Sequence, residues 1–335
     1  MPAGRTIRAR GVAAALATLT ALLVTPGAAA APKAPLIAAA GDIACGPSNP
    51  RFNRGFGIPN SCQQLATSNL LGIRRYAAIL PLGDLQYDDD GSLASFGAGY
   101  EPSWGRFRAI SRPVVGNHEY DDGLGAKGYW DYWNGIGVGR GRAGTRRRGW
   151  YSYNIGSWHL IALNSNCGYV PCGAGSRQVV WLRRELRRNT DRCVLAYMHH
   201  PRFSSGIYEE PGRTRGFWRS LYTGGADVVL AGHDHLYERF APQRPSGQLD
   251  RRRGIVQFTV GTGGYFLFGF GTPRAHSRFR WNGSFGILAM RLGRGSFGWS
   301  YLTAPDGTRI DHGSHRCHNQ PIVKVKPKHK RHKQG

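Results

Sequence analysis

The sequence is short of acidic residues and has no pair of cysteines in the CxxC spacing. Its 335 residues include 20 Asp and Glu against 45 Lys and Arg, which gives a formal net charge of +25. A protein this basic attracts anions such as phosphoesters, nucleic acid or anionic polymers of a cell envelope. Without a CxxC spacing, the six cysteines do not predict a cysteine metal site.

Long apolar runs are also missing. The longest N-terminal run, residues 11–24, has 14 residues and is too short for a typical membrane span. It follows a basic start and precedes the small residues 28–31, so residues 1–31 are predicted to be a secretory signal. The alternative is an uncleaved N-terminal anchor. No later run reaches spanning length, and we therefore expect a secreted, extracellular protein with no transmembrane span.

Export makes disulfides chemically permissible for the six cysteines. Sequence alone allows 15 pairings of six cysteines. Two local pairs and one that ties the C-terminal end to a core strand are favoured: Cys45–Cys62, Cys167–Cys172 and Cys193–Cys317.

Metal-ligand residue types recur just after short apolar segments. Predicted strands at 36–40, 77–82, 113–115, 193–198 and 227–231 are each followed by such residues. In open α/β sheets, ligands bind beyond the carboxyl ends of the strands, so these residues should form one cluster. Carboxylate, amide and imidazole ligands together suit Zn, Fe or Mn. The remaining pattern predicts helices at 62–76 and 175–189, a hairpin at 150–164, and strands at 255–260 and 284–292.

The ordered motifs carry a family resemblance. Gly-Asp-Ile-Ala, Gly-Asp-Leu-Gln-Tyr, Gly-Asn-His-Glu, Met-His-His-Pro and Gly-His-Asp-His resemble the five-block signature of the calcineurin-like metallophosphoesterase superfamily. Tyr87, three residues after Asp84, gives the Gly-Asp-x-x-Tyr form of the secreted purple acid phosphatases. The resemblance implies an α/β fold of the four-layer α/β/β/α sandwich type, with a catalytic domain over residues 32–321.

The resemblance also implies two metal ions, with Fe(III) in the first site and Fe, Zn or Mn in the second. The first ion would bind Asp42, Asp84, Tyr87 and His235, and the second Asp84, Asn117, His199 and His233, so that Asp84 bridges them. Alternatively, Tyr87 only packs beside the site.

Two further histidines are predicted to be catalytic. His118 follows a ligand and resembles the family's outer-sphere histidine, which binds the phosphoryl group or protonates the leaving alkoxide. His200, next to His199, is a weaker candidate for the same work, and its alternative is a structural role.

The expected activity is that of an acid-phosphatase-like, metal-dependent phosphoric ester hydrolase, which cleaves phosphate monoesters with a metal-activated hydroxide. A phosphodiesterase or nuclease on the same site is the first alternative, because nucleic-acid binding draws on Lys and Arg. No nucleic-acid motif with interleaved aromatic residues is present, which makes that partner the less favoured one. A second alternative is an envelope-binding protein with a vestigial site, and the complete ligand set argues against it.

The C-terminal residues 322–335 form a segment of different composition. They contain six Lys or Arg and no acidic residue, which predicts a disordered basic tail. We expect this tail to bind an anionic cell-envelope polymer electrostatically and to hold the protein at the cell wall. The alternative is a solvated tail that only aids solubility.

Overall fold

The computed structural model describes residue 1 and residues 34–189, 193–208 and 212–318. The predicted signal beyond its first residue and the predicted basic tail 322–335 lie outside the described residues, so both stay predictions. Residues 34–318 contain two larger β-sheets, one two-stranded ribbon and the helices that cover them.

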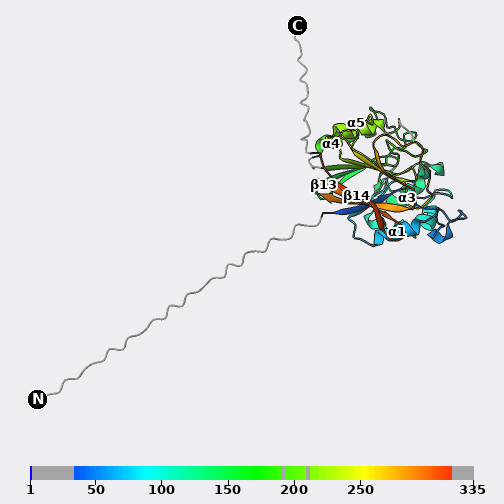
Figure 1. Cartoon of the computed structure of the whole chain (residues 1–335). Helices are drawn as coiled ribbons and strands as arrows, with labels where there is room; N and C mark the ends of the chain where they lie inside the picture. The colour runs from blue at the N-terminus through cyan, green and yellow to red at the C-terminus, as the bar shows by residue number, and fades with distance from the viewer. Residues whose placement is uncertain (2–33, 190–192, 209–211, 319–335) are drawn as a thin grey trace, which may run out of the picture. The chain divides into compact units, whose positions relative to one another are not determined.

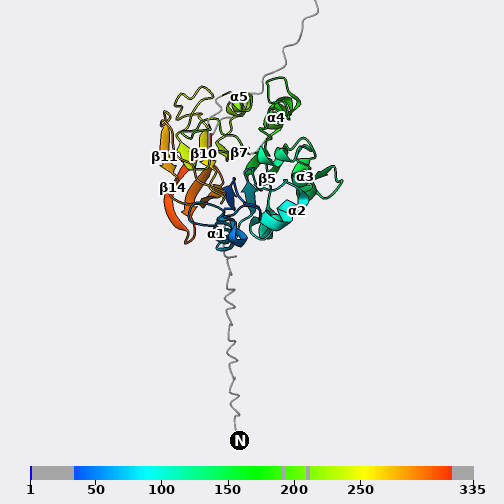
Figure 2. The same cartoon turned by 90° about the vertical axis from the view of Figure 1, so that its right-hand side faces the viewer.

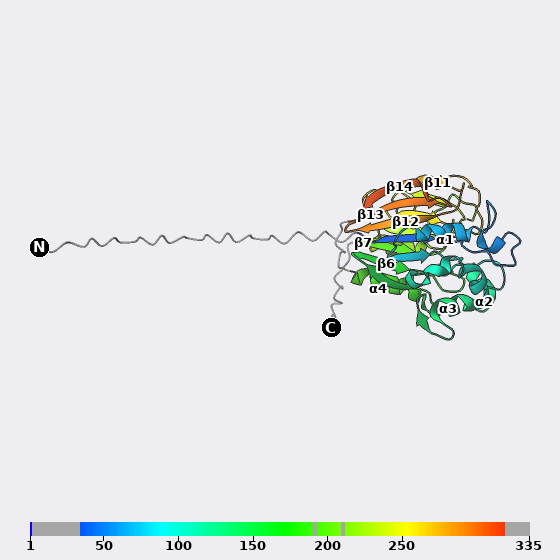
Figure 3. The same ribbon diagram turned by 90° about the horizontal axis from the view of Figure 1, so that it is seen from below.

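The first large sheet has five strands in the order β14-β13-β12-β1-β2. β1 runs parallel to β2, and the other neighbours are antiparallel. Figure 3 shows β12, β13 and β14 following one another across this sheet. The strands are β1 (Leu36–Ala40), β2 (Ala78–Pro81), β12 (Gly286–Gly293), β13 (Ser296–Thr303) and β14 (Thr308–Arg316).

The second large sheet has seven strands in the order β11-β9-β10-β8-β7-β6-β5. Its central strands β6, β7, β8 and β10 are parallel, and antiparallel strands lie on either side of them. The strands are β5 (Tyr151–Ile155), β6 (Trp158–Ala162), β7 (Cys193–Tyr197), β8 (Val228–Ala231), β9 (Tyr237–Phe240), β10 (Val256–Val260) and β11 (Ser277–Trp281). The ribbon pairs β3 (Arg140–Gly141) with β4 (Gly144–Thr145).

Helices α4 (Arg177–Arg188) and α5 (Arg215–Thr223) cover the outer face of the seven-stranded sheet (Figure 1 and Figure 2). Helix α1 (Gln64–Gly72) packs against β12 of the five-stranded sheet, at the opposite side of the sandwich from α4 and α5. The short α2 (Leu93–Ser95) contacts α3 (Lys127–Asn134). This arrangement confirms the predicted four-layer α/β/β/α sandwich.

The central strands are buried on both faces. Along β7, Val194 and Ala196 pack against α4 and α5, whereas Leu195 and Tyr197 belong to the core shared with the five-stranded sheet. Because successive side chains point to opposite faces, both sets must be apolar. This explains why these strands appear in the sequence as continuous apolar runs.

The expected hairpin at 150–164 is present as β5 and β6, and both predicted helices exist as α1 and α4 with shorter bounds. The strand expected at 113–115 is wrong. That segment runs beside β2, where the Val114 N–H donates to the Pro81 carbonyl over 3.0 Å, but it forms no regular strand. The Arg112 N–H donates to the Ile79 carbonyl in the same way, and the only ladder pairing beside β2 in this described segment is the isolated bridge between Ile79 and Ser111.

All three favoured disulfides are present: Cys45–Cys62, Cys167–Cys172 and Cys193–Cys317. None of the helices in the described segments combines the length and apolar character that a bilayer crossing needs.

Candidate metal centre

The predicted ligands stand on tight loops at the carboxyl ends of the strands. Asp42, Asp84 and His233 each follow a glycine and have positive φ angles of 61°, 51° and 73°. Residues with side chains seldom adopt this region, and where they do they often mark functional sites. Two of these loops also lie very close together: a Cβ added to Gly116 would lie 2.0 Å from Asp84 Oδ1, so only glycine fits there. The local backbone is therefore built to bring these side chains together.

One group of predicted ligands surrounds the hydroxyl of Tyr87. The Tyr87 Oη lies 2.9 Å from Asp42 Oδ1, 2.9 Å from Asp84 Oδ2 and 3.0 Å from His235 Nε2. All four side chains are buried. The Tyr87 oxygen thus contacts candidate ligand atoms of three other residues directly.

A second group shares Asp84 with the first. Asn117 Oδ1 lies 3.0 Å from His199 Nε2 and 3.1 Å from His233 Nδ1. His199 Nε2 lies 3.2 Å from Asp84 Oδ2. On the opposite side of its ring, His199 Nδ1 lies 2.9 Å from the Leu82 carbonyl oxygen, to which it donates. That bond orients the ring and leaves Nε2 available as a ligand atom.

The electrostatics of the two groups fit bound cations. Burial alone would raise the pKa of Asp84, but His199 and His118 hold it well below its usual range. His199 in turn has a pKa raised to about 9, because Asp84 outweighs the effect of burial. Burial and the carboxylates of Asp42 and Asp84 raise the pKa of the Tyr87 phenol. Two carboxylates and a phenol converge in a buried region, and a bound cation there would stabilise their negatively charged forms.

Glu119 supports the loop that carries Asp84. Its buried carboxylate accepts hydrogen bonds from the backbone N–H groups of Asp84 (3.0 Å), Leu85 (2.5 Å) and Gly116 (2.6 Å). Burial and the neighbouring Asp84 raise the pKa of Glu119 to about 7. Because it binds two strand-end loops at once, Glu119 fixes the position of Asp84 relative to the Gly116–Asn117 turn.

The two predicted catalytic histidines occupy different surroundings. The His118 side chain is 42 % exposed, its ring centroid lies 4.5 Å from that of Tyr87, and its Nδ1 lies 2.7 Å from Asp121 Oδ2. His200 is buried, and its Nδ1 lies 2.9 Å from the Ser165 hydroxyl. Burial, then His199 and His233, lower the pKa of His200, which favours a neutral imidazole.

The family model for calcineurin-like phosphoesterases matches residues 35–237. The chain belongs to this family. The matched range contains all seven predicted ligands and both predicted catalytic histidines.

This calcineurin-like phosphoesterase is similar to plant purple acid phosphatases. It is 29 % identical over 205 residues to the probable purple acid phosphatase 20 of Arabidopsis thaliana, which covers 56 % of this chain and 44 % of the relative. It is 34 % identical over 179 residues to the phosphoenolpyruvate phosphatase of Allium cepa, covering 48 % of this chain and 36 % of the relative. The matches therefore span less than half the length of these relatives.

Among solved structures, the fold resembles a purple acid phosphatase from yellow lupin seeds. The TM-score is 0.66 at 17 % identity, and the match covers 87 % of this chain and 55 % of the lupin chain. This likeness supports the sandwich fold.

Some residues around the centre have no sequence prediction. Tyr265, on the loop after β10, stacks on Tyr87 with ring centroids 3.6 Å apart. Phe268 stacks on His235 at 4.1 Å. The segment 265–270 is rich in aromatic residues, but nothing in the sequence pairs it with the metal motifs.

Proposed function

We propose that this calcineurin-like phosphoesterase is a secreted phosphatase that hydrolyses phosphate monoesters at a two-metal centre. The observation that carries the proposal is the pair of ligand groups that share Asp84, one around Tyr87 and one around Asn117. The same oxygen, Asp84 Oδ2, contacts Tyr87 Oη in one group and His199 Nε2 in the other.

The first ion would be held by Asp42, Asp84, Tyr87 and His235, and the second by Asp84, Asn117, His199 and His233. Tyr87 offers a hard oxygen, which favours Fe(III) in the first site, while the amide and imidazoles of the second suit Fe, Zn or Mn. Two such ions, when bound, supply Lewis-acid stabilisation of the phosphoryl group and acidify a water to a nucleophile.

His118 is the proposed general acid. Its side chain is partly exposed, and its backbone N–H donates to Asp84 Oδ1 over 2.9 Å. Asp121 would hold the His118 ring through Nδ1, which leaves Nε2 to donate a proton to the leaving oxygen. His200 remains the weaker candidate, because it is buried against Ser165 and has less access to substrate.

Secretion is supported by the three disulfides, since such bonds persist mainly in oxidising compartments. Detection of the mature chain in the culture medium, without residues 1–31, would test this part of the proposal. Its retention inside cells as a full-length chain would contradict it.

The activity test compares a phosphate monoester with the matching diester. We expect the purified protein to hydrolyse para-nitrophenyl phosphate much faster than bis-para-nitrophenyl phosphate and to lose activity on chelation. A visible absorption band should disappear in Tyr87→Phe and persist in the control Tyr222→Phe, whose ring lies on α5. A diester preference would favour the phosphodiesterase alternative, and a colourless, fully active protein with only Zn or Mn would exclude Fe(III).

A further inference from the structure

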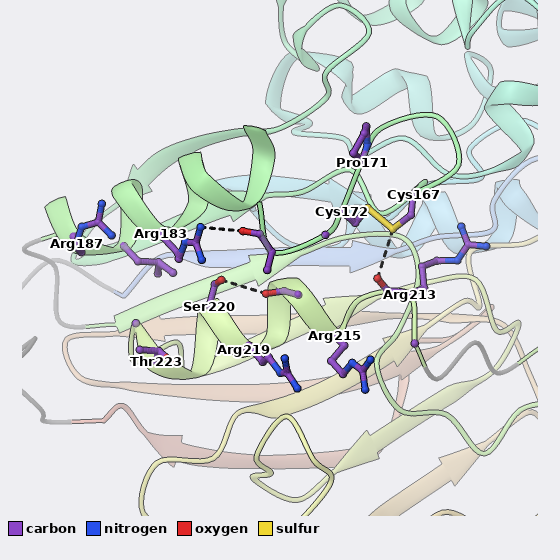
Figure 4. Close-up of a pocket in the computed structure, with 16 residues that line it drawn as sticks. Cys167, Pro171, Cys172, Arg183, Arg187, Arg213, Arg215, Arg219, Ser220 and Thr223 are labelled. Carbon is purple, nitrogen blue, oxygen red and sulfur yellow. Dashed lines mark hydrogen bonds between the residues drawn. A yellow bond between two sulfur atoms is a disulfide. The ribbon is translucent and has the colours of Figure 1, made fainter. Parts of the chain in front are cut away.

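A groove between α4 and α5 is lined by arginines. Its volume is about 1110 Å³, and no acidic residue of the described chain lines it. Figure 4 shows the arginines along both helices. They are Arg183 and Arg187 from α4, Arg213 just before α5, and Arg215 and Arg219 from α5.

Several of these arginines, Arg213 excepted, have no acidic partner among the described residues. Arg183 donates to the Ala174 carbonyl over 2.9 Å, which leaves its charge uncompensated. Arg215 and Arg219 are exposed and form no ion pair with any described residue. A bound anion would neutralise positive charges that line the same groove. Arginine is suited to this because its planar fork binds phosphate oxygens in pairs.

The spacing of the arginines suits an extended ligand. Arg183 and Arg187 are four residues apart on α4, as are Arg215 and Arg219 on α5, so each pair lies on one helix face about 6 Å apart. Two such pairs border the groove. An anion with several charges in a row could contact both helices along its length.

The lining also indicates what kind of polyanion fits. Apart from the arginines, it consists of small or aliphatic residues and the Cys167–Cys172 disulfide, with no aromatic side chain among the described residues. Proteins that bind single-stranded nucleic acid typically stack bases on aromatic rings. The lining described therefore favours a ligand that is held through its phosphate groups over one that stacks bases.

One end of the groove adjoins the candidate metal centre. Cys167 Sγ lies 3.5 Å from the Arg213 carbonyl oxygen, and Ser165, two residues earlier, contacts His200. The hydroxyl of Thr214 donates to the Pro201 carbonyl over 3.4 Å. Arg213 therefore sits on a segment bonded directly to the His199–Pro201 loop, which places this end of the groove beside the loop that carries His199.

We propose that this groove binds a linear chain of phosphate groups and guides its terminal phosphate to the metal centre. The proposal rests on the proposed phosphatase function and names a substrate class for it. In the reaction, the terminal P–O–P bond breaks. Water supplies the oxygen gained by the released phosphate, and the shortened chain leaves with the bridging oxygen.

Steady-state kinetics with inorganic polyphosphate and para-nitrophenyl phosphate test the proposal. The groove variant is Arg183→Gln/Arg187→Gln/Arg219→Gln. The matched control, Arg294→Gln/Arg309→Gln/Arg316→Gln, removes the same charge from exposed positions around β13 and β14. We expect the groove variant to raise KM for polyphosphate at least about tenfold and to change para-nitrophenyl phosphate hydrolysis less than about twofold, since each lost arginine removes a phosphate contact. Equal polyphosphate kinetics in both variants would overturn the proposal.

Retention on phosphocellulose gives a second readout that needs no turnover. In the groove variant, the slope of log retention against log salt should become less steep by about two, because three arginine–phosphate contacts with a single-stranded polyanion are lost. The control should keep the slope of the wild type. If no phosphoester is hydrolysed but this loss occurs, the groove stands and the phosphatase proposal fails. If single-stranded DNA cellulose shows the same loss, the groove binds nucleic acid and the phosphate-chain proposal is wrong.

Discussion

The two ends of the central strands are built in opposite ways. At the carboxyl ends of β1, β2, β7 and β8, buried polar groups converge, and the loops after β1, β2 and β8 contain residues with positive φ angles. At the amino ends of β7 and β8, Cys193 is linked to Cys317, and buried Asp227 accepts hydrogen bonds from the Val194 N–H (2.7 Å) and the His318 N–H (2.6 Å). One end gathers charge and strained backbone for chemistry, while the other closes the fold with a covalent link and satisfied hydrogen bonds.

Asp84→Asn should produce the largest effect at the carboxyl end. It removes a negative charge from the residue shared by both ligand groups and should lower kcat/KM for para-nitrophenyl phosphate beyond the roughly 10–100-fold that loss of an outer-shell partner costs. Asparagine also tolerates a positive φ, so the melting temperature should change little. Wild-type turnover with both metals bound would show that Asp84 is not the bridge.

His118→Ala separates proton donation from phosphate binding. If His118 protonates the leaving group, esters of aliphatic alcohols should lose ~10²–10⁴-fold in kcat, and an activated aryl phosphate far less. An equal loss with both ester types would assign His118 to binding the phosphoryl group.

Glu119→Gln tests the support behind Asp84. A carboxamide presents an NH₂ group where the carboxylate accepts backbone N–H bonds, so one loop must lose its partner. We expect about 10–100-fold lower kcat/KM and weaker metal retention in dialysis. The control Glu185→Gln removes a carboxylate on α4 that accepts from Ser152, and it should leave both unchanged. Similar values for the two variants would exclude a positioning role.

Removing the Cys193–Cys317 disulfide should lower stability and leave activity nearly unchanged. Its partners are 124 residues apart, and Cys193→Ala/Cys317→Ala should lower the free energy of unfolding by about 2–5 kcal/mol. At 25 °C, kcat/KM should stay within about twofold, because the link lies at the amino end of β7. Denaturant titration and kinetics measure the two quantities. A large loss of activity in a variant that is still fully folded would contradict the assignment of activity to the carboxyl ends of the strands and of stability to their amino ends.

Asp121→Asn should have the smallest effect, visible only in the pH profile. Burial would lower the pKa of His118, but Asp84 and Asp121 raise it above its usual value. The protonated imidazole is the active form of a general acid, so activity falls as pH rises through this pKa. Without Asp121 the pKa drops, and the alkaline limb of the kcat profile should move to lower pH. An unmoved limb, with the variant folded, would mean that another group sets it.

Most residues of the candidate centre could be proposed from the sequence because they follow recognisable strands. Asp42, Asp84 and His233 each come after a short apolar run and a glycine, and the structure brings them together with the other predicted ligands. Their supports could not be predicted. Glu119 is the last residue of the Gly-Asn-His-Glu motif, but its contacts with two separate loops depend on the fold and cannot be read from the sequence. Tyr265 stacks on Tyr87 from a distant part of the chain.

The same limit applies to the fold and the groove. Strands buried on both faces stood out as apolar runs, but the partly exposed β13 and β14 did not. In the sequence, the arginines of α4 look like the residues of any solvated helix face. Only the packing of the two helices shows that Arg215 and Arg219 of α5 line the same groove.

Anomalous diffraction from crystals of active protein would test the two-metal account most directly. The account predicts two peaks roughly 3.5–4 Å apart, with the Asp84 carboxylate in contact with both, Tyr87 at one and Asn117 at the other. A single peak, or none, in crystals whose dissolved protein still hydrolyses para-nitrophenyl phosphate would contradict it.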